Sequence, residues 1–453
     1  MRRTLLTLFL VVLTGACTGL TLGENQPGGS TQLEYGSIGV DPHTETSFVL
    51  QTKTHVGVQT KLLYAVNPDG GSPVIVADLT EYHDIRIVFP QNKILIMGEK
   101  WGVDEFIVLD ATTFAPQTTI TTGGRYQGVR VSPSGRFLAV ADHNKPNFPI
   151  HIVDTVTWEI HVIPHKGDTL EAMWLNQTDE LVSIVFDGVS TPKRTARIMS
   201  WAMMDVVNGG FAAGVSGTWP NPMIDVTVND VTLDALFSFT WVGISPNDGV
   251  AAFPVRSLAP DGKFDEYSVI LLDVFSGATQ WVENARGPVG FTPDSANMVS
   301  YRYVGVEQDP QLLLVDTLTL DEQALDLPMV SGPQFFVSSQ GNFVVVASQW
   351  GNESLVLYDV DAGNMSTTTG PAIGLSEFVA RPEMAELWLV DNGLYRMDLL
   401  ANSLTAMPLT FTPKRINILP KREQLVLSAR SSNTLSFYDL EAQQVIRTVM
   451  LGL

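Results

Sequence analysis

The stretch VRVSPSGRFLAVADHNKPNFPIHIVDTVTWEIHVIP, residues 129–164, decides the fold of this chain. It holds four short runs of β-branched and aliphatic residues, separated by turn residues such as Pro, Ser, Gly and Asn. The third run ends in an aspartate, and this feature recurs about every 43 residues, at Asp110, Asp154, Asp205, Asp273, Asp316, Asp359, Asp398 and Asp439. A period near 40 with four short strands per unit is typical of a β-propeller blade.

Nine such units can be placed along the sequence, the first with Asn67 where the others have aspartate. They span residues 36–79, 83–122, 126–165, 169–231, 238–284, 288–328, 332–370, 374–410 and 414–453. The fold predicted is all-β, a single β-propeller of four-stranded antiparallel blades. Nine repeats are counted, and eight or seven blades stay open as alternatives, because the fourth unit has a long step and no clear last strand.

The two best-formed units, residues 129–164 and 416–451, resemble the YVTN-type bacterial propeller repeat. The second of them reads INILPKREQLVLSARSSNTLSFYDLEAQQVIRTVML. The resemblance extends over nearly the whole chain after its first 31 residues. It implies the fold alone, because such repeats occur in many unrelated binding proteins and in some enzymes.

The first residues, MRRTLLTLFLVVLTGAC, indicate export. Arg2 and Arg3 give a positive start, residues 5–13 are apolar, and small residues follow, which is the order of a secretory signal peptide. The apolar run is too short to span a membrane. We therefore expect a signal peptide at 1–16, a lipidated cysteine and flexible tether at 17–31, and a propeller domain at 32–453 with a long insertion near 205–232.

Cys17 is the one cysteine of the chain, and residues 13–17, LTGAC, resemble the lipobox of bacterial lipoproteins. The family prefers Leu where this chain has Thr14. The resemblance implies a lipid on Cys17 that anchors the chain without spanning the membrane. By analogy with enteric lipoproteins, Thr18 after the cysteine favours the outer membrane, with the chain facing the periplasm or the cell surface. The alternative is ordinary cleavage near Ala16, which leaves a thiol.

The chain is strongly acidic, with a formal net charge of −21 over 453 residues. Such a surface repels phosphate backbones, so the charge excludes a nucleic-acid-binding role. The recurrent aspartates themselves have a structural explanation. A short carboxylate at a tight turn accepts backbone N–H groups, so we predict that these eight residues hold turns and take no part in catalysis.

In a propeller, the loops between second and third strands share one face with the connections between blades, and we call it the long-loop face. The sequence predicts long loops there at residues 99–105, 142–149, 187–195, 256–266, 302–310 and 348–353. Long loops on a rigid ring are where binding usually resides. The aromatic candidates for anchoring a partner are Trp101, Phe148, Tyr303 and Trp350, joined by Trp219 from an irregular stretch at 208–230. The alternative for each is ordinary packing on a neighbouring blade.

All seven histidines lie between positions 43 and 165. His83, His143 and His165 fall beside aspartates in loops of the long-loop face, and imidazole with carboxylate is a zinc-type ligand set. No close histidine pair supports such a site, and no GxSxG, GxxxxGK[ST], HExxH or CxxC motif occurs. The sequence therefore assigns no cofactor and no catalytic residue.

The interpretation that these features favour is a non-enzymatic binding or scaffold propeller of the bacterial cell envelope. It would be an accessory lipoprotein that recognises an envelope protein through its long-loop face. Two other classes stay open: a lactonase-like propeller hydrolase, and a glycan-binding module, which requires Trp101 and Trp350 to be exposed.

Overall fold

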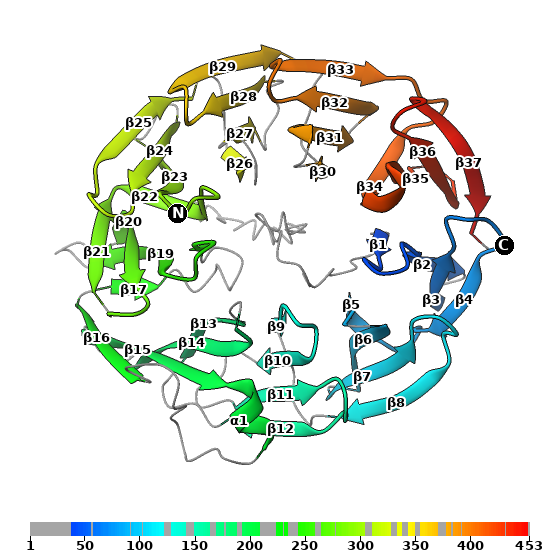
Figure 1. Ribbon diagram of the computed structural model, residues 1–453, viewed down its shortest axis with the longest axis horizontal. Helices are drawn as coiled ribbons and strands as arrows, with labels where there is room; N and C mark the ends of the chain where they lie inside the picture. Colours follow the sequence, from blue (N-terminus) through cyan, green and yellow to red (C-terminus); the bar gives the residue numbers. More distant parts are fainter. Residues whose placement is uncertain are drawn as a thin grey trace, which may run out of the picture.

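A computed structural model of the chain shows a ring of antiparallel sheets (Figure 1). It describes residues 38–451 except 56–57, 91, 102, 122–127, 142–148, 164–168, 176–177, 188–192, 209–222, 230, 234–242, 259–263, 277, 304–309, 328–332, 338–342, 349–353, 370–376, 382–383, 391 and 431. The described residues form nine sheets, here numbered 1 to 9 in chain order. The predicted all-β propeller of four-stranded antiparallel blades is confirmed.

Each sheet is built from one continuous stretch of chain. Sheets 1 to 3 contain β1 (Ile38–Val40), β2 (Ser47–His55), β3 (Val58–Val66), β4 (Val74–Asp78); β5 (His83–Val88), β6 (Lys93–Lys100), β7 (Val103–Asp110), β8 (Pro116–Thr121); and β9 (Gly128–Val131), β10 (Phe137–Ala141), β11 (Ile150–Asp154), β12 (Ile160–Ile163). Sheets 4 and 5 contain β13 (Thr169–Leu175), β14 (Glu180–Asp187), β15 (Lys193–Ala202), β16 (Met223–Asn229); and β17 (Val231–Leu233), β18 (Gly243–Ile244), β19 (Val250–Leu258), β20 (Phe264–Asp273), β21 (Thr279–Glu283).

Sheets 6 and 7 contain β22 (Ala285–Phe291), β23 (Asn297–Tyr303), β24 (Pro310–Asp316), β25 (Glu322–Asp326); and β26 (Pro333–Val337), β27 (Phe343–Ser348), β28 (Ser354–Asp359), β29 (Asn364–Thr369). Sheets 8 and 9 contain β30 (Glu377–Arg381), β31 (Glu386–Val390), β32 (Leu394–Asp398), β33 (Ser403–Met407); and β34 (Pro413–Leu419), β35 (Gln424–Ala429), β36 (Thr434–Asp439), β37 (Gln444–Met450). In the described residues they are accompanied by two short helices, α1 (Met203–Val207) and the 3-10 turn η2 (Pro420–Arg422).

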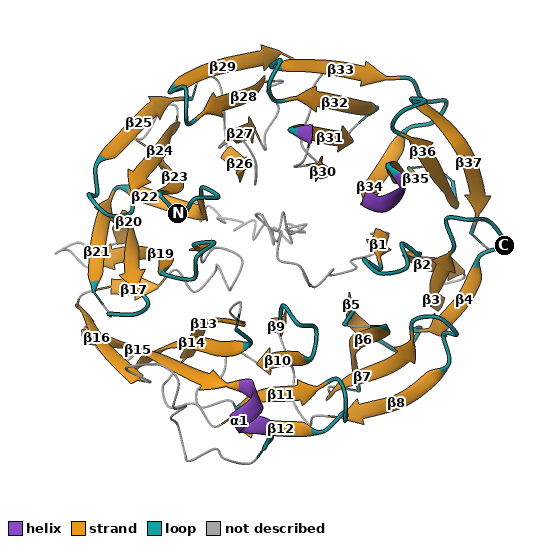
Figure 2. Cartoon of the chain, viewed as in Figure 1, coloured by secondary structure: helices purple, strands orange, loops and turns teal. Residues whose placement is uncertain are grey.

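Within a sheet the strands run in order from the centre of the ring to its rim, as Figure 2 shows for β34 to β37. Because neighbouring strands are antiparallel, the first-to-second and third-to-fourth turns lie at one end of every sheet. We call this end of the ring the tight-turn face. The long-loop face, at the other end, carries the second-to-third hairpins and the connections between sheets.

The recurrent aspartates hold the turns of the tight-turn face, as predicted. Asp316 accepts the backbone N–H groups of Leu318 and Thr319 at 2.8 and 2.7 Å. Equivalent bonds from backbone N–H groups reach Asp110, Asp154, Asp273, Asp359, Asp398 and Asp439, and Asn67 makes one in sheet 1. Their role is therefore structural.

Asp205 departs from this pattern. It lies in α1, which follows the third strand of sheet 4, instead of closing a strand at a turn. The stretch 208–230, predicted to be irregular, also contains a strand: β16 pairs with β15 and completes sheet 4. A strand here was hard to predict because the intervening residues are rich in Gly and Pro, which break both helix and strand patterns.

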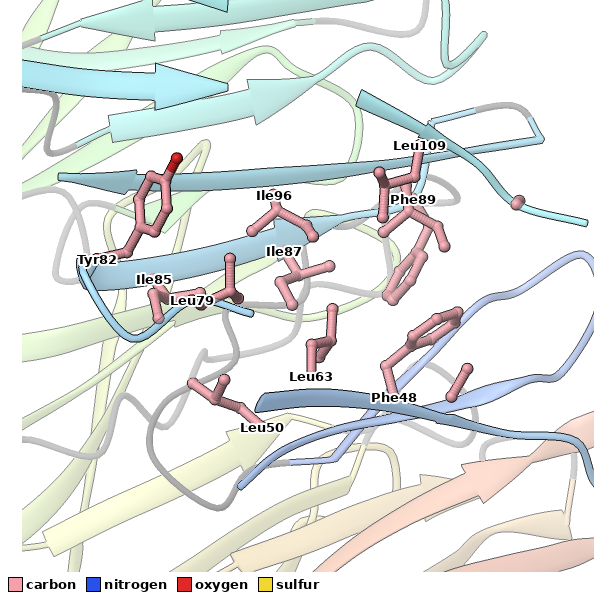
Figure 3. Close-up of a cluster of buried hydrophobic side chains, with 13 residues drawn as sticks. Phe48, Leu50, Leu63, Leu79, Tyr82, Ile85, Ile87, Phe89, Ile96 and Leu109 are labelled. Carbon is pink, nitrogen blue, oxygen red and sulfur yellow. The ribbon is translucent and has the colours of Figure 1, made fainter. Parts of the chain in front are cut away.

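Hydrophobic side chains fill the space between neighbouring sheets. Figure 3 shows the cluster between sheets 1 and 2, where Phe48 and Leu63 face Ile87 and Ile96. Phe48, Leu63 and Ile87 are fully buried. Burial of each such side chain contributes roughly 1.5–3 kcal/mol relative to leaving it in water.

The ring closes where sheet 9 meets sheet 1, beside the two ends of the described chain (Figure 1). No strand is exchanged between these two sheets in the described residues. A shared apolar cluster joins them instead, with Tyr64 and Val66 packed against Val426 and Phe437. Asn417 adds a 2.8 Å hydrogen bond from its Nδ2 to the Ile38 carbonyl. Side-chain contacts thus take the place of a shared strand at the closure.

Candidate functional site

The structure describes some of the predicted site residues and leaves others outside the described residues. Trp101 is described in full, at the tip of the hairpin between β6 and β7. Tyr303 is the last residue of β23 and lies opposite Pro310 of β24. The other candidates lie outside the described residues: Cys17, His143, Phe148, His165, Trp219 and Trp350.

The hairpin that carries Trp101 is tighter than predicted. The sequence predicts a loop over residues 99–105, but Lys100 pairs with Val103, so most of this stretch belongs to β6 and β7. At the tight-turn face the first residue of β6, Lys93, pairs with Asp110, as Phe137 pairs with Asp154 in the shorter hairpin of sheet 3. Since the tight-turn ends match, the extra length of β6 and β7 lies at the long-loop face.

Trp101 stands exposed on this hairpin. Its side chain is 83% accessible, and its backbone adopts the left-handed region with φ 56°. Left-handed φ values are uncommon for bulky residues, and Gly, Asn or Asp usually occupies such positions. The turn therefore holds a large indole surface out from the ring at a fixed point.

Tyr82 supports the base of the hairpin from the connection between β4 and β5. Its ring lies against Gly98 of β6, where an added Cβ would come within 2.9 Å of Tyr82 Cδ1. Its hydroxyl donates a 2.7 Å hydrogen bond to Glu105 Oε2 of β7. Burial, with further help from this bond and the charge of Glu105, raises the pKa of Tyr82 well above its ordinary value. Tyr82 therefore stays protonated and keeps donating this bond.

Charged groups surround the tyrosine. Lys100 Nζ lies 2.8 Å from Glu81 Oε2 and 5.4 Å from the centre of the Tyr82 ring. The hydrogen bond to Glu81 raises the pKa of Lys100, so it is charged at neutral pH. Acidic side chains lie here as well: Glu81 and Glu105 are joined by Glu99 of β6, whereas Asp104 of β7 is buried. A second cation, Lys61, donates from its Nζ to the Tyr82 carbonyl at 2.5 Å, so two ammonium groups lie among these carboxylates.

His83, the described member of the predicted metal set, is exposed at the start of β5 and lies opposite Glu99. Among the residues that the structure describes, no group of three His, Cys, Asp or Glu side chains could hold a metal ion. In the same part of the chain, no helix is long and apolar enough to cross a membrane.

Sequence reasoning missed Glu81 and Tyr82. They lie in a connection between repeats that carries no sequence motif. The one feature that could have identified them is that this connection lies on the long-loop face. Together with Trp101, Lys100 and Glu105 they form what we call the Trp101 surface. An exposed indole on a hydrogen-bonded base is an arrangement suited to recognition, because it offers a large apolar surface with a polar edge.

Comparisons with known proteins support the fold. No family model matches this chain, and no curated protein matches it. Among solved structures, one of the eukaryotic initiation factor aligns with a TM-score of 0.52 at 11% identity, over 80% of this chain and 86% of that chain. A structure of the Dos1 propeller aligns with a TM-score of 0.46 at 11% identity, over 74% and 86% of the two chains. The dihydro-heme d1 dehydrogenase NirN aligns with a TM-score of 0.47 at 12% identity, over 80% and 73%. At these identities the likeness concerns the propeller fold alone.

Proposed function

We propose that this chain is a non-catalytic binding propeller of the bacterial cell envelope that recognises a protein partner through the Trp101 surface. The observation that carries the proposal is the 83% exposure of Trp101 at the tip of a hairpin whose base is fixed by Tyr82 and Glu105. Exposed tryptophans held on a rigid base are frequent anchors of protein interfaces. The surrounding charges then form the polar rim that such interfaces have.

The proposed place in the cell follows from the N-terminal sequence. Cleavage before Cys17 and lipidation of its thiol would tether the propeller to the outer membrane. The first strand β1 begins at the long-loop end of its sheet. A Cys17→Ser variant that still partitions with the membrane would contradict the lipid anchor.

The test compares two tryptophans. Full-length tagged protein is crosslinked in living cells, and bound proteins are identified by mass spectrometry for the wild type, Trp101→Ala and Trp281→Ala. Trp281 is 40% exposed on β21 at the rim of the ring and serves as the matched control. The proposal expects one envelope protein that is lost with Trp101→Ala and retained with Trp281→Ala. Retention of every crosslink in Trp101→Ala would refute it.

The same variants distinguish a protein partner from a glycan ligand. If Trp101→Ala loses binding to purified cell-wall polysaccharide while its protein crosslinks stay unchanged, the indole binds a glycan. This result would overturn the proposed protein partner.

A further inference from the structure

A second set of exposed apolar side chains lies on the tight-turn face, far from the Trp101 surface. The residue two positions after the recurrent aspartate stands at the tip of each third-to-fourth turn. In four sheets this tip is apolar and exposed: Val156 by 66%, Phe275 by 50%, Leu318 by 87% and Leu400 by 75%. We call these four residues the apolar tips.

Each tip is held by a turn with fixed hydrogen bonds. In sheet 6, Leu318 donates its N–H to Asp316 Oδ1, and the Leu320 N–H donates to the Asp316 carbonyl at 3.0 Å. The Thr317 N–H donates to the Ala296 carbonyl at 2.9 Å, which joins this turn to the first-to-second turn. Sheet 3 repeats the three bonds around Asp154. The apolar tips are therefore presented by the rigid frame of the ring.

The apolar tips occupy one arc of the ring. In Figure 1 the turns between β11 and β12, β20 and β21, β24 and β25, and β32 and β33 belong to sheets 3, 5, 6 and 8, with sheet 4 between the first two and sheet 7 between the last two. Two further exposed methionines fall in this arc at the same face, Met204 of α1 at 43% and Met384 before β31 at 50%. The tip positions are polar in sheet 7, namely Asp361, and in sheets 9, 1 and 2, namely Glu441, Asp69 and Thr112. The apolar tips thus lie within the stretch of ring from sheet 3 to sheet 8, with the acidic tip Asp361 among them.

Negative charge accompanies the apolar tips. Hydrogen bonds from the Thr319 and Leu318 N–H groups hold the pKa of Asp316 below its ordinary value. Further exposed carboxylates stand on the turns of sheets 3 and 6, at Glu159 and Asp321, and on the turn of sheet 7, at Asp361. A chain with a net charge of −21 is repelled by anionic lipid and by a second copy of itself. A protein with a basic surface is the occupant that matches this face in both charge and apolarity.

We propose that the tight-turn face docks a second, basic protein, with the apolar tips as anchors and the turn carboxylates as its ionic rim. The two faces of the ring would then hold two partners at once. The long-loop face binds through Trp101, and the tight-turn face through the arc from Val156 to Leu400. This inference does not depend on the proposed function, because it uses different residues on the opposite face.

The experiment removes two tips without disturbing the fold. The variant Leu318→Ser with Leu400→Ser is compared with Val162→Ser with Ile446→Ser, whose residues are 51% and 49% exposed on the outer strands β12 and β37. The probe is a fluorescein-labelled amphipathic peptide of Lys and Leu, followed by fluorescence anisotropy. The control probes are the same peptide with Glu in place of Lys, and vesicles of phosphatidylglycerol or phosphatidylcholine.

The proposal expects that the wild type and the outer-strand variant bind the Lys peptide alike. The tip variant should bind at least about tenfold more weakly, since each lost anchor removes a buried apolar contact. Equal binding by the tip variant would overturn the proposal, as would equal binding of the Glu peptide or of either vesicle. Self-association that is lost in the tip variant would assign the face to a second copy instead.

A photo-crosslinking residue at position 318, and in parallel at position 162, gives the second measurement in cells that produce the full chain. The proposal expects a product from position 318 alone, from a protein with an isoelectric point above about 8, and its loss in Leu400→Ser. The same product from position 162, or an acidic partner, would overturn it.

Discussion

Arg422 and Asp69 meet across the closure of the ring although 353 residues separate them in sequence. The guanidinium donates from Nη1 to Oδ1 at 2.5 Å and from Nη2 to Oδ2 at 2.8 Å. Its Nε also lies 3.3 Å from Oε2 of Glu45, a carboxylate that is buried in sheet 1. One side chain of sheet 9 thus binds two carboxylates of sheet 1.

Arg422→Ala should weaken the closure. The pair with exposed Asp69 is worth less than about 1 kcal/mol, because such pairs are screened by solvent. The buried Glu45 loses a cation as well, so we expect a total loss of about 1–3 kcal/mol in the free energy of unfolding, measured in urea. Asp69→Asn is the control and should cost less than about 1 kcal/mol. Equal losses in the two variants would mean that Glu45 draws no support from Arg422.

Asp316→Ala should lower the urea midpoint at neutral pH, because two turn N–H groups lose their acceptor. Asp316→Asn keeps a carbonyl acceptor and should stay closer to the wild type. Backbone hydrogen bonds lower the pKa of Asp110 and Asp316 in the folded state. The corresponding stabilisation is complete above about pH 5 and is lost as the pH falls below about 4. The pH dependence of the midpoint should therefore be shallower in Asp110→Asn with Asp316→Asn, and an unchanged slope would contradict this account.

Gly98→Ala should displace Tyr82. The new Cβ would lie 2.9 Å from Cδ1 and 3.1 Å from Cβ of the tyrosine, closer than carbon atoms tolerate. We expect a loss of about 1–3 kcal/mol in the free energy of unfolding. Tyr82→Phe removes only the hydroxyl bond to Glu105 and should cost roughly 1–2 kcal/mol. Near-ultraviolet circular dichroism should report the ring displacement in the alanine variant and not in the phenylalanine variant.

Trp101→Gly should separate binding from folding. The indole is 83% exposed and its φ of 56° suits glycine, so the free energy of unfolding should change by less than about 1 kcal/mol. Binding of the partner proposed above should still be lost. A loss of stability much larger than this would show that the indole packs on the fold instead of serving as an anchor.

The sequence indicated the propeller because its signals are local. Residues 129–164 contain a complete blade, and the backbone N–H groups that bind the turn aspartates' side chains lie only two or three residues ahead of them. A turn of this kind is specified by its own few residues, whatever the rest of the chain does. Asp205 was the exception, because α1 replaces the turn there and a position in the repeat does not reveal such an insertion.

The candidate sites were less predictable from sequence. Trp101 stood out as an aromatic residue between strands, but its supports could not be identified, since Tyr82 reaches Glu105 from a different strand connection. The apolar tips were equally hidden, because a single Leu or Phe in a turn is unremarkable in sequence. Their common face becomes visible only when the turns are placed around one ring.

The sequence by itself therefore determined the blade: its period, its four strands and its aspartate turns, all of which depend on residues close in the chain. Only the tertiary structure decided the closure through Arg422 and Asp69, the base beneath Trp101 and the arc of apolar tips. These depend on contacts and exposures between residues far apart in sequence, which local hydrophobic and turn patterns do not encode.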